Sequence, residues 1–130
     1  MISNKNNKSV NSLISFNECT GLNVAGTEAV KEAFGFGGTI ISNKGDPEII
    51  LSVKFRDNVN LSGIMIESSM DGKKCPTSMQ LFVNNPSLDF SDVGSIAPTE
   101  SVNLEINLGK TVSLKIAKFR CVSTLVVYLY

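Results

Sequence analysis

The segment spanning residues 78–92 constrains the fold more than any other part of the chain. Its first half alternates apolar and polar side chains, with Met79, Leu81 and Val83 on one side. This two-residue period is typical of a β-strand with one buried face. Pro86 then ends the strand, because proline has no N–H to donate to a neighbouring strand. We therefore expect a half-buried strand that stops at a corner.

The corner itself has residues suited to a turn. Asn84 and Asn85 precede Pro86, and short amide side chains can bond their own backbone. Leu88 and Phe90 follow as an apolar pair, which we expect to tuck the loop under the sheet. The sequence thus predicts an anchored loop after the strand.

Further strands are expected wherever apolar residues alternate or run together. They lie at residues 49–55, 61–67, 102–108, 112–116 and 125–130. A turn is expected at residues 56–58, and a tight hairpin turn at Gly109 and Lys110. Short antiparallel strands separated by turns are typical of an all-β sandwich.

The N-terminal part is expected to be less regular. Residues 1–11 are rich in Asn, Lys and Ser, and we expect a disordered segment that leaves residues 12–130 as the domain. Residues 27–34 predict one short helix, capped by Thr27 and ended by Gly35. Cys19 and Leu22 are expected to anchor a turn-like segment to the core.

The last apolar stretch, residues 125–130, can be interpreted in three ways. An apolar strand at a sheet edge favours association with other chains. The strand is therefore central in its sheet, paired with another molecule, or the product of a shortened gene. These alternatives predict either a monomer or a dimer formed through an exposed terminal strand.

Composition limits the classes of partner. A chain of 130 residues with 42% hydrophobic residues can bury a core as one domain. It has 12 basic and 12 acidic residues, whereas nucleic-acid and anionic-membrane binders need an excess of positive charge. No apolar run approaches the ~20 residues of a membrane-spanning helix. We therefore expect neither nucleic acid nor a membrane as a partner.

The absence of histidine limits the chemistry. It excludes Ser-His-Asp and Cys-His catalysis and histidine metal sites. Cys19, Cys75 and Cys121 form no Cys-x-x-Cys pair, so a zinc knuckle or thioredoxin-type redox pair is not expected. We expect no catalytic residues, no metal and no cofactor, and the polar N-terminus favours an intracellular setting.

Two further features are candidates for chemical sites. Cys75 lies beside two lysines, which would lower a thiol pKa, but an incidental thiol is favoured because no partner group is near in sequence. Cys19 and Cys121 are expected to be small buried residues. Asp89 and Asp92 bring oxygens together, and capping of a turn is favoured over calcium binding.

Several segments, in order, resemble the PITH domain, the proteasome-interacting domain of thioredoxin-like proteins. The most characteristic one is residues 75–92, Cys-Pro-Thr-Ser-Met-Gln-Leu-Phe-Val-Asn-Asn-Pro-Ser-Leu-Asp-Phe-Ser-Asp. Residues 118–125 are similar to a later Lys-Phe-x-x-Val-x-x-Leu element. Residues 19–23, 47–51 and 59–66 resemble the first half of the domain.

The resemblance implies a jelly-roll β-sandwich similar to galactose-binding-like domains. It also implies a non-enzymatic binding module whose partner is the 26S proteasome regulatory particle. We expect the protein in the cytoplasm and also in the nucleus. Loops held by a rigid sandwich commonly carry such contacts. The expected partner-binding residues are those of the corner: Asn84, Asn85, Pro86, Asp89, Phe90 and Asp92.

The sequence departs from the family pattern in three respects. The acidic residues usual just before the strand at residue 49 are reduced to Asp46 and Glu48, with Lys44 among them. No thioredoxin-type Cys-x-x-Cys occurs, so the chain resembles the standalone form and no disulfide reductase activity is expected. Family members continue past the position of Tyr130 with a further strand and tail, so a C-terminally shortened domain is expected. The alternative function is a small-ligand or glycan-binding module, although the chain has no Trp and two Tyr to form an aromatic platform.

Overall fold

The computed structural model describes residues 2–4, 11–24, 48–67 and 76–130. The strands there are β1 (Ile2–Asn4), β2 (Thr20–Leu22), β3 (Ile49–Val59), β4 (Leu61–Met65), β5 (Ser78–Val83), β6 (Glu100–Asn103), β7 (Thr111–Ser113) and β8 (Val122–Leu129). Three single-turn 3-10 helices connect them: η1 (Asn11–Leu13), η2 (Phe16–Glu18) and η3 (Ile116–Lys118). In this part of the chain, no helix is long and apolar enough to cross a bilayer.

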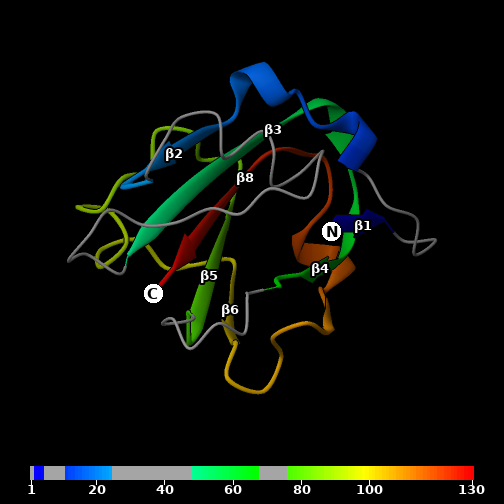
Figure 1. Ribbon diagram of the computed structural model, residues 1–130. Coiled ribbons are helices and arrows are strands. Elements are labelled where there is room, and N and C mark those ends of the chain that lie inside the picture. Colours follow the sequence, from blue (N-terminus) through cyan, green and yellow to red (C-terminus); the bar gives the residue numbers. More distant parts are fainter. Residues whose placement is uncertain (1, 5–10, 25–47, 68–75) are drawn as a thin grey trace.

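The strands form two antiparallel sheets. The five-stranded sheet has the order β2-β3-β8-β5-β6, and the three-stranded sheet has the order β1-β4-β7. In Figure 1, β8 lies between β3 and β5, and β4 lies beside β1 on the other side of the molecule. The expectation of an all-β sandwich is confirmed.

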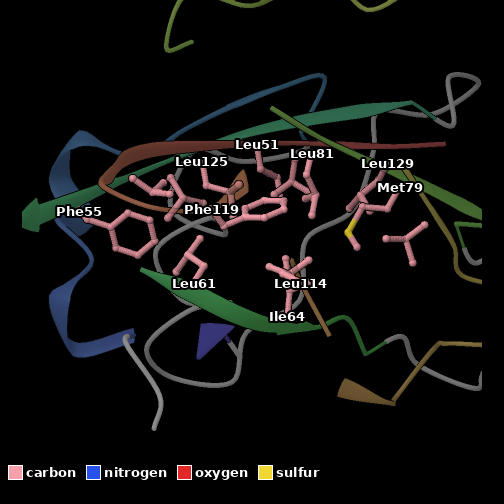
Figure 2. Packing of buried hydrophobic residues seen from close by; sticks show 14 of the residues in the cluster. Leu51, Phe55, Leu61, Ile64, Met79, Leu81, Leu114, Phe119, Leu125 and Leu129 are labelled. Carbon is pink, nitrogen blue, oxygen red and sulfur yellow. The ribbon is translucent and has the colours of Figure 1, made fainter. Parts of the chain in front are cut away.

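The main core lies between the two sheets. Leu81 and Leu125 of the five-stranded sheet and Leu61 of the three-stranded sheet are each 0% exposed. Figure 2 shows the Phe119 ring between these two layers, and this side chain is also 0% exposed. Strand alternation sends every second residue into this layer, which accounts for the periodicity of the sequence.

A second, smaller core covers the opposite face of the five-stranded sheet. It contains Ile50, Phe82, Leu88, Val126 and Tyr128. Leu88 comes from the loop after β5, so this loop lies over the outer face of the sheet. β8 is consequently buried on both faces, which explains why its sequence is apolar at almost every position.

β8 also has neighbours on both edges. Its Val127 pairs with Leu51 of β3 on one side and with Leu81 of β5 on the other. The terminal strand is therefore not an exposed edge, because its backbone groups already bond to β3 and β5 within the sheet. The alternative of a central strand holds.

The predicted turn at residues 56–58 is wrong. β3 continues through these residues to Val59, and its pairing shifts between Lys54, opposite Thr124, and Val59, opposite Val122. The extra residues of β3 form an irregularity in the pairing, which, like a β-bulge, lets a strand bend without ending. Polar residues that resemble a turn in sequence can therefore occupy an irregular part of a strand.

The predicted hairpin at Gly109 is also wrong. β6 pairs with β5 in one sheet, and β7 pairs with β4 in the other. Leu104 is 1% exposed, whereas Ile106 is 68% exposed and stands in a turn where the Leu108 N–H donates to the Leu104 carbonyl at 3.0 Å. The buried Leu104 anchors the chain where it crosses between sheets, so the later apolar residues do not continue the strand.

The N-terminal expectations have mixed outcomes. Ile2–Asn4 form β1 and pair with β4, so disorder is the wrong expectation for these residues. A short polar strand can be held by backbone hydrogen bonds, which the side-chain pattern does not reveal. Cys19 packs against the main core, but Leu22 is 39% exposed. The predicted helix at residues 27–34 and Cys75 lie outside the described residues.

Candidate functional site

The corner after β5 begins at Asn84, whose backbone is left-handed with φ of 56°. Asparagine tolerates this conformation better than most residues with a Cβ atom. Its N–H donates to the Thr124 carbonyl at 2.8 Å, so the residue is still paired to β8 as the chain turns. The position of the corner was predicted correctly, because the Asn84 side-chain amide and Pro86 both favour a turn.

The side-chain amide of Asn84 is engaged within the protein. Its Oδ1 accepts hydrogen bonds from the Ser123 N–H at 2.8 Å, the Ser123 hydroxyl at 3.0 Å and the Thr124 N–H at 3.2 Å. Its Nδ2 donates to the Cys121 carbonyl at 3.1 Å. The amide therefore fastens the corner to the start of β8.

A second asparagine, Asn60, also bonds to the stretch before β8. Asn60, between β3 and β4, accepts a hydrogen bond at its Oδ1 from the Cys121 N–H at 3.0 Å. Cys121 has a positive φ of 52° and an exposed side chain, so its expected burial is wrong. By contrast, Cys19 is half-buried, and this burial raises the pKa of its thiol. Sequence reasoning missed Asn60, because nothing local links it to a residue 61 positions away.

The loop beyond Pro86 is held by two aspartates. The Asp92 Oδ2 accepts from the Asp89 N–H at 3.0 Å, and the Asp92 N–H donates to the Asp89 carbonyl at 3.0 Å. The Asp89 Oδ1 in turn accepts from both the N–H and the hydroxyl of Ser91. The predicted capping of a turn is confirmed.

These hydrogen bonds determine the charge of Asp89. The Ser91 hydroxyl, and then the Ser91 N–H, hold the pKa of the Asp89 carboxyl below its ordinary value of 3.8. Asp89 is exposed and therefore presents a negative charge to the solvent at neutral pH. No group of three His, Cys, Asp or Glu side chains suited to a metal occurs in the described ranges.

Two apolar residues of the loop, Leu88 and Phe90, pack against the outer face of the five-stranded sheet. Leu88 is 5% exposed in the smaller core. The half-buried Phe90 ring contacts the Tyr128 ring edge-on, with 6.3 Å between centroids and 76° between planes. Tyr128 is itself fixed, since its hydroxyl donates to Glu48 Oε1 and its ring stacks on Tyr130 at 4.6 Å. Phe90 therefore helps to position the loop.

The remaining residues of the predicted site differ in exposure. Pro86 and Asp89 are exposed, whereas Asn85 and Asp92 are half-buried. Pro86 and Asp89 also line a hollow of about 240 Å³ together with residues of β2 and β3. The corner thus forms one wall of a surface groove. Its other wall was not identified from the sequence.

The family of this chain is shown by its similarity to known proteins. The family model of the PITH domain matches residues 1–130. The chain belongs to the PITH domain family. This confirms the resemblance drawn from the strand, corner and return at residues 75–92, and PITH domains are galactose-binding-like sandwiches.

Two curated PITH proteins are similar to this chain. PITH domain-containing protein 1 of Xenopus laevis is 32% identical over 90 residues, which cover 68% of this chain and 43% of that protein. PITH domain-containing protein 1 of Dictyostelium discoideum is 29% identical over 85 residues, which cover 64% of this chain and 42% of that protein. This PITH chain therefore spans less than half the length of these relatives.

Proposed function

We propose that this PITH domain is a non-enzymatic protein-binding module that docks on the 26S proteasome regulatory particle. We place this activity in the cytoplasm and also in the nucleus. The observation that carries the proposal is the match of the PITH family model to the whole chain. Proteasome interaction is the property that the family resemblance implies.

The construction of the corner supports a binding role. Asn84 ties one end of the loop to β8, and Leu88 buries its middle against the sheet. A loop held in this way loses little conformational freedom when a partner binds, so less of the interaction free energy is lost in ordering it. Binding loops on rigid sandwiches follow this arrangement.

The exposed residues of the loop are the contact residues in this proposal. Pro86, Ser87 and Asp89 are exposed, and Asn85 and Asp92 lie half-buried beside them. Asn84 and Phe90 have a positioning role, because the amide of one and the ring of the other contact β8. This arrangement supports contact with a protein surface by a small rigid projection.

Affinity purification tests the proposal. The tagged protein is isolated from its native cells in mild salt, and co-purifying proteins are quantified by mass spectrometry. We expect regulatory-particle subunits in near-stoichiometric amounts, and direct binding when the purified protein and purified regulatory particle are mixed on a gel-filtration column. A folded protein that captures no regulatory particle in either experiment contradicts the proposal.

Matched variants locate the contact. Asp89→Lys reverses an exposed charge on the loop, and we expect it to reduce capture of the regulatory particle. Ile106→Asp changes a residue that is 68% exposed and lies in a different turn, so it is the control and should bind as the wild type does. Equal capture of the regulatory particle by both variants would show that the contact does not involve the corner. A parallel glycan array tests the alternative function, which predicts bound glycans and no captured particle.

A further inference from the structure

The hollow beside the corner joins residues that are far apart in the sequence. It has a volume of about 240 Å³ and lies between β2, β3 and the turn at residues 86–89. β2 and β3 pair directly, so this part of the outer sheet face is continuous. We call this hollow the β2–β3 groove.

The floor and rim of the β2–β3 groove are apolar. Ile50 and Leu88 form the floor and are 2% and 5% exposed. Leu22 stands opposite Ile50 in the strand register, and it is 39% exposed at the rim, where Pro86 is exposed as well. Burying an apolar side chain between them would remove further apolar surface from water, which favours binding.

Three hydroxyl groups also line the groove. Thr20 and Ser52 face each other across β2 and β3, and Ser87 lies in the opposite wall. In the described part of the chain, none of the three hydroxyls makes a hydrogen bond within the protein. Each can both donate and accept, which suits the N–H and carbonyl groups of an extended peptide.

Among the residues that the structure describes, Asp89 is the charged residue that lines the groove. The Asp89 carboxylate is exposed to solvent, and its Oδ1 accepts hydrogen bonds from the N–H and the hydroxyl of Ser91. No lysine or arginine within the described ranges forms an ion pair with it. Charge complementarity therefore favours a cationic side chain, and a carboxylate at this position repels phosphate groups of nucleic acids and lipids.

We infer that the β2–β3 groove receives an apolar side chain of a partner peptide, with an adjacent lysine or arginine paired to Asp89. This inference rests on the proposed function, because it assigns the peptide chemistry that the docking surface recognises. It adds β2 and β3 to a surface that the sequence placed on the corner alone.

A peptide titration followed by NMR tests the inference directly. The probe is the acetylated octapeptide Gly-Ser-Gly-Leu-Lys-Gly-Ser-Gly, added to the ¹⁵N-labelled protein. We expect saturable shifts confined to amide signals around Leu22, Ser52 and Ser87, with a Kd on the order of 1 mM. Replacing the peptide Leu by Ala should weaken binding about tenfold. Replacing its Lys by Glu should weaken it about threefold or more.

Protein variants provide the reciprocal test. Leu22→Asp and Asp89→Asn should each weaken binding of the Leu-Lys peptide, while Ile106→Asp should bind it as the wild type does. The amide spectrum of each variant shows whether it is folded, and Asp89→Asn preserves the size of an exposed side chain. Equal shifts with all three peptides, or shifts remote from the groove, would overturn the inference.

The same variants separate this inference from the docking proposal. Regulatory-particle capture that survives in Leu22→Asp overturns the groove inference and leaves docking intact. Peptide binding in the groove without capture of the particle supports the groove and overturns proteasome docking. Loss of both peptide and particle binding in Leu22→Asp, with retention of both in Ile106→Asp, supports the two together.

Discussion

Asn84 and Ser123 are joined by two hydrogen bonds, since the Asn84 Oδ1 accepts both the N–H and the hydroxyl of Ser123, at 2.8 and 3.0 Å. The two residues are 39 positions apart in the sequence. The corner that carries the candidate contact residues is therefore fixed by the central strand of the sheet, in addition to its own local turns. Disturbing this link should loosen the corner and the fold together.

Asn84→Ala should destabilise the protein by about 2–3 kcal/mol. The substitution leaves the Ser123 and Thr124 N–H groups without their acceptor, and it places alanine at a φ of 56°. Urea unfolding measures the effect, with a lower midpoint and an unchanged slope.

Two variants accompany Asn84→Ala. Asn84→Asp keeps an acceptor oxygen and should retain most of the stability. Asn58→Ala removes an exposed side chain that makes no hydrogen bond to the described residues, and it should change stability by less than about 0.5 kcal/mol. A loss as small in Asn84→Ala as in Asn58→Ala would contradict the structural role of the corner amide.

Phe119→Ala should cost about 3–5 kcal/mol of unfolding free energy. The ring is fully buried between the two sheets, and its removal leaves a cavity that strands on both sides cannot readily fill. Phe119→Leu should cost less, because it retains more of the buried volume. Thermal unfolding of the two variants ranks them. Equal stability would show that the layer around Phe119 collapses to fill the space.

Tyr128→Phe should lower stability by about 1.5–3 kcal/mol, since the Tyr128 hydroxyl donates to the Glu48 carboxylate. Tyr130→Phe is the matched control, because within the described residues the Tyr130 hydroxyl accepts a long, exposed hydrogen bond of 3.4 Å from Gln80. Chemical unfolding of both variants gives the comparison. A larger loss of stability in Tyr130→Phe than in Tyr128→Phe would contradict the stabilising role of the Tyr128 hydroxyl.

Ser91→Ala should raise the pKa of Asp89 toward its ordinary value, because the Ser91 hydroxyl is the main cause of the lowered pKa. A lowered pKa stabilises the fold above pH 3.8, and this contribution is lost as the pH falls through the lowered pKa. The stability difference between wild type and Ser91→Ala should therefore be present at neutral pH and vanish in acid.

Carboxyl NMR titration measures the pKa of Asp89 in each protein. Ser87→Ala removes a hydroxyl from the same loop that makes no hydrogen bond in the described structure, so it is the control and should leave this pKa unchanged. An Asp89 pKa that is the same in wild type and Ser91→Ala would show that the Ser91 hydroxyl does not lower it.

Side-chain periodicity predicted the strands that alternate clearly. β5 at Ser78–Val83 and the first part of β3 follow from a two-residue period, because one face of each strand is buried more deeply than the other. The same reasoning failed at residues 102–116, where apolar residues continue to alternate through a turn. The burial of Leu104 and the exposure of Ile106 could not be distinguished without the second sheet.

The candidate site was predicted in part. The corner at Asn84 and Pro86 was recognisable from turn chemistry, and the Asp89 and Asp92 caps from residue type. The opposite wall of the groove, with Thr20, was not recognisable. β2 reaches the corner only through the strand order of the sheet, which no local pattern encodes.

The sequence by itself determined the all-β class, the corner after β5 and the membership of the PITH family. These depend on local periodicity, on proline geometry and on residues in a recognisable order. The tertiary structure alone decided that β8 is central, that Asn84 and Asn60 hold the chain around Cys121, and that β2 meets the corner. Such contacts join residues far apart in the chain, and they are selected by the packing of whole sheets, so their free energy has no signature in any short stretch of sequence.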